Sequence, residues 1–579
     1  MVQRSCRRKR VRVQRQRATL QQGMAHLGTK VVGESPSLKR EPLKFSAGKV
    51  AAQRRRQHAV TIGKERREAI LRTKRLCRDG VVGDNEDQVD AGMILDEEGA
   101  ALDAQTNETV GELKSALRIQ GKDALRKKLE VLRTLRCLLS KSTVPPVETA
   151  VQAGVVPLLV ECLSFGSPDE QRFGFDKAQH GLKFMFRRIS LCSKEELLEA
   201  AWCLTNIAAG EAEQTKALLP ALPLLVAHLG DRSSVPIAEQ CAWALGNVAG
   251  EGEELRNILI AQGALPALAR MMLSDNGSMA RTAAWALSNL IKGPHPWAAT
   301  ELIKINGALD AIIRHMKKAD DELATEVAWV VVYLTALSNS ATSLLVNSDL
   351  VQLLVGRLAA SECLQLLIPV LRSIGNLVAC DSHVADEVLA AGYGTTVLNA
   401  SDNVMGALVK CLSSDHRVLK KEAAWVLSNI AAGSLAHKQL IYFSDALPLL
   451  LHLLSTAPFD IRKEVAYALG NVCVVQSEGS HQPNLILDHL VSLVDRGCLP
   501  GFISLVRSPD LEAARLGLQF LEMVMRGLPN GRGPKLVERE DGIDAMERFQ
   551  FHENEHLRSM ANELVDKYFG EDHGHLDED

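Results

Sequence analysis

The sequence predicts an all-α solenoid of stacked helical repeats, on three observations. Between residues 202 and 471 an aromatic residue is followed four positions later by asparagine five times, usually within A-W-x-L-x-N. Successive aromatic positions are 41, 42 and 44 residues apart, and the following steps are 43, 53 and 42. The chain of 579 residues is 46% apolar but only 4% aromatic, which fits cores of Leu, Ala, Val and Ile. A period of about 42 residues indicates HEAT or armadillo repeats, whose stacking needs no single large core.

The segments between these copies have the apolar spacing of helices. Residues 263–272, GALPALARMM, begin with a glycine turn and continue with Leu, Ala and Met at helical intervals. The uncharged run 327–346 is long enough to raise the question of a membrane span. It contains several Ser, Thr and Asn residues and keeps the repeat register, so we predict a buried repeat helix there.

Charge divides the chain near Arg78. Residues 1–78 hold 23 Lys and Arg against 4 acidic residues, a formal +19, which leaves −22 for the remainder of a chain with a total of −3. The head has too few apolar residues to fold alone, so we predict a disordered basic arm that the acidic body attracts. Residues 79–112 are acidic and contain glycine, and we predict that they form a linker.

Several classes of protein are not predicted. Residues 1–20 lack the apolar core of a secretory signal. The 12 cysteines show no metal-ligand spacing, so we expect reduced thiols in a cytosolic or nuclear protein, with no metal site and no cofactor. Because the sequence has no P-loop, nucleophile elbow or kinase signature, we do not predict an enzyme.

The recurring pairs predict a peptide-binding wall, which we call the ladder. Residues i and i+4 project from one helix face, so stacked helices would align the Trp and Asn side chains in rows. An Asn amide can pair with both backbone groups of an extended peptide, and indole faces attract cations. A single such pair is most often structural, but recurrence at one period argues against that reading. Acidic residues also lie beside the ladder, at Glu239, Glu251, Glu326, Glu422 and Glu464. The predicted ligand is an extended peptide rich in Lys and Arg.

Specific motifs resemble the importin-α family over roughly residues 40–575. They are SFGSPDEQ (164–171), AWCLTNIAAG (from 201), CAWALGNVAGEG (from 241), RTAAWALSNL (from 281), KEAAWVLSNIAAG (from 421) and HENEHLRSMANELVDKYFGED (552–572). The resemblance implies a right-handed superhelical solenoid of about ten three-helix armadillo repeats over residues 113–570, followed by an acidic tail, 571–579. It also implies a nuclear import adaptor that shuttles between cytoplasm and nucleus.

The resemblance further implies two sites for nuclear localisation signals. The major site would comprise Trp202, Asn206, Gly210, Thr215, Gln240, Trp243, Asn247, Glu251, Trp285 and Asn289. The minor site would comprise Trp329, Tyr333, Arg372, Asn376, Glu422, Trp425, Asn429, Glu464, Tyr467 and Asn471. Glu251 stands where the family has an Asp that clamps the principal lysine. Arg372 replaces a Trp and is expected to disfavour a basic side chain, and Tyr467 in place of Trp predicts a weaker minor site.

Residues 39–78 carry the densest basic run. By itself this run fits a nucleic-acid arm, a solvated charge run or a helix for an acidic partner. A helix over residues 59–76 would have little apolar face, which favours the acidic partner. The resemblance identifies this partner as importin-β and implies contacts from Arg54, Arg55, Arg56, Lys64, Arg66, Arg67, Arg72, Lys74 and Arg75.

Lys74 and Arg75 also match the family's autoinhibitory cluster, which folds back into the major site. Leu76 stands where a third basic residue is common, so we expect weak autoinhibition. The implied partners are basic cargo, importin-β and an export receptor with Ran-GTP. Neither membrane insertion nor direct nucleic-acid binding is expected.

Two segments fit the family poorly. Residues 1–38 are a basic extension, either genuine or non-native. Residues 172–195 interrupt a repeat and are either a surface loop or a retained intron, of which we favour the second. The alternative function is an armadillo scaffold without transport activity, but such scaffolds use basic grooves, whereas this body is acidic.

Overall fold

The computed structural model describes residues 91–570, except 120–121, 141–144, 165–192, 231–232, 294, 381, 392–402 and 475–482. The chain divides into two units, Met1–Leu43 and Lys44–Asp579, and every described residue belongs to the second. The described residues form helices and turns, with no strand. The predicted basic arm, the extension 1–38, the tail 571–579 and most of the insertion 172–195 lie outside them.

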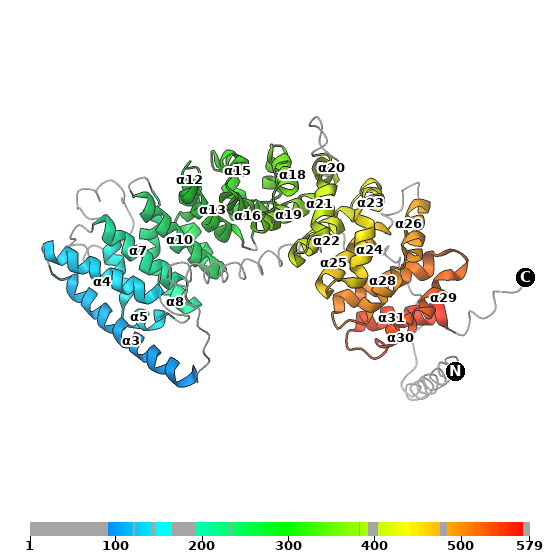
Figure 1. The fold of residues 1–579 in the computed structure, drawn as a ribbon, viewed down its shortest axis with the longest axis horizontal. Coiled ribbons are helices and arrows are strands. Elements are labelled where there is room, and N and C mark those ends of the chain that lie inside the picture. Colours follow the sequence, from blue (N-terminus) through cyan, green and yellow to red (C-terminus); the bar gives the residue numbers. More distant parts are fainter. Residues whose placement is uncertain are drawn as a thin grey trace, which may run out of the picture. The chain divides into compact units, whose positions relative to one another are not determined.

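Two helices open the described part and nine sets of three follow, in agreement with about ten repeats (Figure 1). The third helix is the longest in every set, and the first helices are short except α26 (Pro483–Asp495), which has 13 residues. The bounds are α3 (Ala91–Ala116) and α4 (Lys122–Ser140), then α5 (Val147–Gln152), α6 (Val155–Leu163) and α7 (Lys194–Ala208); α8 (Ala212–Lys216), α9 (Leu222–Ala227) and α10 (Val235–Glu251); α11 (Glu253–Ala261), α12 (Ala264–Met272) and α13 (Gly277–Ile291); α14 (Trp297–Lys304), α15 (Ala308–Lys317) and α16 (Asp321–Leu337); α17 (Asn339–Val346), α18 (Leu350–Ala360) and α19 (Leu364–Val378); α20 (Ser382–Ala390), α21 (Val404–Ser413) and α22 (Arg417–Ala431); α23 (Leu435–Tyr442), α24 (Ala446–Thr456) and α25 (Phe459–Val472); α26 (Pro483–Asp495), α27 (Leu499–Val506) and α28 (Leu511–Gly527); α29 (Arg532–Arg539), α30 (Gly542–Glu547) and α31 (Glu555–Phe569).

The third helices pack on one another in chain order, from α4 through α7, α10, α13, α16, α19 and α22 to α25 (Figure 1). The alanine before each ladder aromatic explains this close approach. Ala201, Ala242, Ala284, Ala328, Ala424 and Ala466 are all fully buried. A methyl group is small enough to let the backbones of neighbouring helices come together, so the alanine of A-W-x-L-x-N is a packing residue.

We predicted a linker over residues 79–112. From Ala91 onward that prediction is wrong, because the chain is helical there. Helix α3 occupies this stretch and packs on α4. Its buried residues Thr106, Val110 and Leu113 lie at helical spacing. The hydroxyl of Thr106 donates to Leu102 O at 2.7 Å, so this polar side chain can be buried without an unsatisfied donor.

Two other boundaries also differ from prediction. The uncharged run 327–346 is not one helix, because Ser338 ends α16 and caps α17 by accepting from Ala341 N at 3.2 Å. Within the described ranges no single helix is long and apolar enough to cross a membrane. Two sharply bent pairs, Asn339–Val346 with Leu350–Ala360 and Ile486–Asp495 with Leu499–Val506, pass that test only together. At the predicted insertion, residues 193–195 belong to the repeat, because Ser193 forms a capping box with Glu196 at the start of α7.

Candidate functional site

The predicted ladder residues all lie on consecutive third helices. These residues are Trp202 and Asn206 on α7, Trp243 and Asn247 on α10, Trp285 and Asn289 on α13, Trp329 and Tyr333 on α16, Arg372 and Asn376 on α19, Trp425 and Asn429 on α22, and Tyr467 and Asn471 on α25. The rings of Trp243 and Trp285 meet edge to face, with their centroids 6.5 Å apart. Trp202, Trp243 and Trp425 are half-buried, and the other ladder rings are buried.

Each ladder asparagine donates its amide N–H to the preceding third helix. The acceptor is always a backbone carbonyl of the preceding helix in the stack. It belongs to the residue just before the position that matches the asparagine, which holds Cys137 on α4 and Tyr333 on α16. The bonds are Asn206 to Arg136 O (3.4 Å), Asn247 to Thr205 O (3.3 Å), Asn289 to Gly246 O (3.2 Å), Asn376 to Val332 O (3.1 Å), Asn429 to Gly375 O (3.0 Å) and Asn471 to Ser428 O (2.9 Å). Sequence reasoning missed this role, because it assigned both halves of the amide to a peptide.

The amide oxygens therefore carry the remaining capacity for a ligand. Asn289 Oδ1 accepts from Lys292 Nζ at 3.2 Å, and that lysine is buried. Asn247 Oδ1 is buried without a hydrogen-bond partner among the described residues. This oxygen therefore has hydrogen-bonding capacity that the described residues do not use.

A small residue before each asparagine makes room for the next aromatic ring. A side chain added at Gly246 would overlap the Trp285 ring, and one added at Gly375 would overlap the Trp425 ring. Thr205, Ser288 and Ser428 hold the same register. Val332 holds this register before Tyr333, and the slot that follows it holds Arg372 instead of an aromatic residue.

The supporting residues of the predicted major site lie on α8 and α10 and just beyond α7. Thr215 Oγ1 donates to Ala208 O at 3.4 Å, and Gln240 Nε2 donates to Thr205 Oγ1 at 2.8 Å. A side chain at Gly210 would meet the end of the Gln214 side chain, which would have to move. Glu251 is the last residue of α10 and is half-buried. Thr215 and Gln240 thus both bond to the last turn of α7, and Glu251 lies at the carboxyl end of α10.

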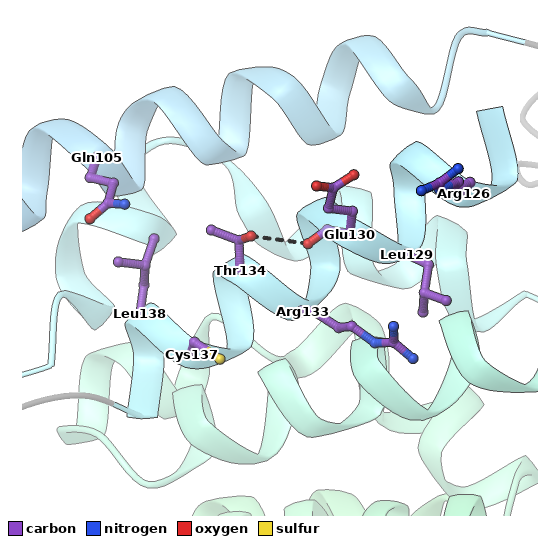
Figure 2. Close-up of a pocket in the computed structure, with 8 residues that line it drawn as sticks. All are labelled: Gln105, Arg126, Leu129, Glu130, Arg133, Thr134, Cys137 and Leu138. Carbon is purple, nitrogen blue, oxygen red and sulfur yellow. Dashed lines mark hydrogen bonds between the residues drawn. The ribbon is translucent and has the colours of Figure 1, made fainter. Parts of the chain in front are cut away.

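The spacing of the ladder extends back to α4, where Arg133 stands at the position of the aromatic residue and Cys137 at the position of the asparagine. Both line a cleft with Gln105, Arg126, Leu129, Glu130, Thr134 and Leu138 (Figure 2). Arg133 Nε lies 3.4 Å from Glu199 on α7. Arg136 pairs with Glu199 at 2.6 Å and lies over the Trp202 ring at 4.5 Å. A resident cation thus contacts the first indole of the ladder.

A second resident cation lies in the middle of the ladder. Arg372 Nη2 lies 2.5 Å from Glu422 Oε1, and its guanidinium lies over the Trp329 ring at 5.4 Å. Both charged side chains are buried. Arg372 therefore neutralises Glu422, which we had predicted to attract a ligand cation.

In the last predicted slot of the ladder, the tyrosine hydroxyl forms a hydrogen bond to the next repeat. Tyr467 donates its hydroxyl to Glu512 Oε1 on α28 at 2.7 Å. Glu512 also pairs with Lys463 at 2.8 Å. An indole could not reproduce this O–H···O bond, so Tyr467 is held in place by the following repeat.

Among the described residues, no cluster of three or more His, Cys, Asp or Glu side chains could hold a metal ion.

Comparison with known proteins agrees with this architecture. The Armadillo/beta-catenin-like repeat profile matches residues 252–292, 400–432 and 436–474, and a HEAT-like repeat profile matches 195–248. The crystal structure of an engineered protein has a similar fold, with a TM-score of 0.63 and 22% identity over 79% of this chain and 98% of the other.

Relatives in plants are much more similar in sequence. Importin subunit alpha-9 of Arabidopsis thaliana is 62% identical over 541 residues, which are 93% of this chain and 98% of that protein. The chain belongs to the importin-α family. Importin subunit alpha-2 of Oryza sativa is 60% identical over 93% of this chain and 96% of its own length. Importin-α proteins are nuclear import adaptors and not enzymes, so the chain is a non-enzymatic armadillo-repeat protein.

Proposed function

We propose that this importin-α protein binds Lys- and Arg-rich nuclear localisation signals along the ladder. The observation that carries this proposal is the repeated pairing of an aromatic ring with an asparagine oxygen on successive third helices. Ring faces attract ammonium and guanidinium groups, and the amide oxygens accept peptide N–H groups. The body of the chain is acidic, which favours a basic ligand.

The predicted major site is retained in this proposal, and the predicted minor site is reduced to its residues on α22 and α25, without Trp329, Tyr333, Arg372 and Asn376. The major site lies on α7, α10 and α13, which carry three consecutive Trp/Asn slots, with Arg136 over the Trp202 ring of the first. The minor site lies on α22 and α25, with Tyr467 as its weaker aromatic group. The Arg372–Glu422 pair separates them, because a peptide cation over Trp329 would meet the guanidinium already there.

The basic arm supplies the transport step in this proposal. Residues 39–78 bind importin-β, and Lys74 and Arg75 compete with cargo for the major site when importin-β is absent. Because the arm is tethered, it competes at high effective concentration. An export receptor with Ran-GTP then returns the adaptor to the cytoplasm. These statements rest on family membership and on the charge of the arm.

The deciding experiment measures affinity for a fluorescent peptide with two basic clusters, using the full-length chain at physiological salt. Trp243→Ala with Trp285→Ala should weaken binding strongly, since two ring faces of the major site are lost. Trp297→Ala is the matched control, because Trp297 is 56% exposed and lies outside the ladder. Absence of peptide binding by the wild type and by an arm variant would overturn the proposal.

Autoinhibition has its own comparison. Lys74→Ala with Arg75→Ala should raise the affinity of the full-length chain for the peptide. Equal affinity for the wild type and this variant would leave peptide binding intact and reject autoinhibition. Binding of importin-β to the wild type, and its loss when Arg54, Arg55 and Arg56 become Glu, would distinguish a transport adaptor from a scaffold.

A further inference from the structure

The slot on α4, before the first Trp of the ladder, has a different chemistry from most of the slots that follow. Arg133 stands where the other helices usually have an aromatic residue, and Cys137 stands where they have asparagine. Arg136 takes the position before Cys137, which holds a small residue at most other slots, and its guanidinium lies over the Trp202 ring at 4.5 Å. This slot therefore presents cations where most other slots present a ring face that attracts a cation.

The charges around this slot favour an anion. Glu199 on α7 is shared by two guanidinium groups, since its Oε2 lies 2.6 Å from Arg136 Nε and its Oε1 lies 3.4 Å from Arg133 Nε. Arg126, two turns earlier on α4, and Glu130 line the same cleft as Arg133. Three guanidinium groups against two carboxylates leave a formal charge of +1 at this end of the ladder, although the body of the chain is acidic.

Arg133 and Arg126 are accessible to a ligand. Both line the cleft of about 450 Å³, together with Leu129 of α4 and Gln105 of α3 (Figure 2). The Arg133 side chain is 56% exposed although it contacts Glu199, and Arg126 is exposed as well. A cleft of this volume is large enough to receive a side chain of a bound peptide.

Two other cations associated with the third helices are enclosed by the protein. Arg372 pairs with Glu422, and both side chains are buried. Lys438 is 1% exposed, and its ammonium donates to Ala431 O at 2.6 Å and to Asn471 O at 2.7 Å. These two bonds hold Lys438 between the carboxyl ends of α22 and α25. The exposed guanidinium groups on α4 are therefore better placed to bind a ligand than these two cations.

We propose that Arg133, together with Arg126, is a specificity-determining residue that binds an acidic side chain of the peptide, beside its basic cluster. A peptide that follows the ladder past Trp202 onto α4 meets guanidinium groups there. Elsewhere the acidic body disfavours Asp and Glu in the ligand. Preferred ligands thus carry an acidic residue on one side of their basic clusters and not on the other. This inference rests on the proposed function and deepens it.

The test compares an acidic residue with its neutral isostere at both ends of the ligand. The probes are fluorescent, end-blocked peptides with two Lys/Arg clusters, in which each of three residues outside either cluster is in turn Asp or Asn. The full-length chain is used, and the ratio of the Asp and Asn affinities is compared, because the basic arm competes equally with both peptides. We expect Asp to bind roughly threefold more tightly than Asn at one end, as for an exposed ion pair, and less tightly at the other.

Substitutions of Arg133 identify the group that is responsible. Arg133→Gln should abolish the preference for Asp, and Arg133→Lys, which keeps the charge, should retain most of it. Arg270→Gln is the matched control, because Arg270 is an exposed arginine on α12, outside the ladder. This control removes the same charge and should leave the wild-type ratio unchanged.

The outcomes separate this inference from the proposed function. An equal Asp-to-Asn ratio in the wild type and in Arg133→Gln, or a wild type that prefers Asp at neither end, would overturn the inference while basic peptides still bind. Absence of binding of every peptide to the wild type would instead reject the proposed function.

Melting temperatures establish that the variants are folded. We expect Arg133→Gln to fold, because Glu199 keeps its pair with Arg136. If it does not fold, Arg126→Gln decides the question, since this exposed side chain lines the same cleft. A lowered preference for Asp in Arg126→Gln would support the inference, and an unchanged preference would overturn it.

Discussion

The amide group of each ladder asparagine stabilises the packing of neighbouring repeats, and only its remaining hydrogen-bonding capacity can bind a ligand. Its N–H is bonded to the preceding repeat at every slot that has an asparagine. The same residue therefore contributes to stability and to binding. Mutations of ladder asparagines will show both effects, and only the central slot, outside the two proposed sites, separates them.

Asn376 offers this separation, because it lies in the interrupted slot with Arg372. Asn376→Ala removes the hydrogen bonds that the amide donates to Val332 O and Thr335 Oγ1. We expect urea unfolding to show a loss of about 1–2 kcal/mol. Asn347→Ala, at an exposed position, should change stability by less than about 0.5 kcal/mol. Equal stability of the two variants would contradict a stacking role for the amide.

Gly246 and Gly375 give a second residue-scale prediction. A methyl group at either position would overlap the next indole, Trp285 or Trp425. Gly246→Ala should therefore weaken peptide binding at the major site, and Gly375→Ala should weaken it at the minor site. Gly356→Ala is the control, because nothing lies within 4 Å of the added methyl, and helix propensity predicts a gain of about 0.5–1 kcal/mol. Peptide titrations and thermal melts of the three variants would check this.

At the scale of helices, the sequence predicted which elements repeat but not how their ends are joined. The ladder could be found because Trp and Asn recur with a helical spacing inside a longer period. Helix α3 was missed because acidic residues and glycine masked the stripe of Thr106, Val110 and Leu113. Lys438 was missed because a lysine in a sequence is normally assigned to a solvated surface.

Lys438 also makes the free energy of unfolding depend on pH. Burial lowers the pKa of Lys438 to about 8, from an ordinary value of 10.5. Between these pH values the unfolded chain binds more protons than the folded chain, so this residue makes the free energy of unfolding rise with pH. Relative to Lys438→Met, we expect the wild type to gain up to about 3 kcal/mol over this range. Denaturant unfolding at pH 7.5 to 10.5 measures the difference, and a flat difference would contradict the lowered pKa.

At the scale of the molecule, the separation of charge between basic arm and acidic body and the stacking of the repeats both favour a basic ligand. The solenoid presents its aromatic and amide side chains from an acidic body of formal charge −22. The sequence alone could establish this division, because charge counts need no structure. The sequence could not show that resident cations contact Trp202 and Trp329, since Arg136 and Arg372 are brought to those rings by packing between repeats.

Salt should therefore weaken binding of a basic peptide. We expect affinity to fall by roughly tenfold between 50 and 300 mM NaCl, because the Debye length shortens and the long-range attraction is screened. The variant Lys74→Ala with Arg75→Ala is the suitable protein, since it lacks the basic cluster proposed to compete. Fluorescence anisotropy at several salt concentrations measures the slope. An affinity independent of salt would mean that contacts within the ladder, and not the charge of the body, determine binding.

The oxygen of Asn247 has a consequence for how tightly one peptide bond is held. A buried acceptor without a partner costs about 1–3 kcal/mol, and a ligand N–H placed there removes that cost without first displacing a protein hydrogen bond. N-methylation of each peptide amide in turn should therefore be unequal in effect. One methylated position, the one facing α10, should lose far more affinity than its neighbours, and it would mark the rung on which the ligand is anchored.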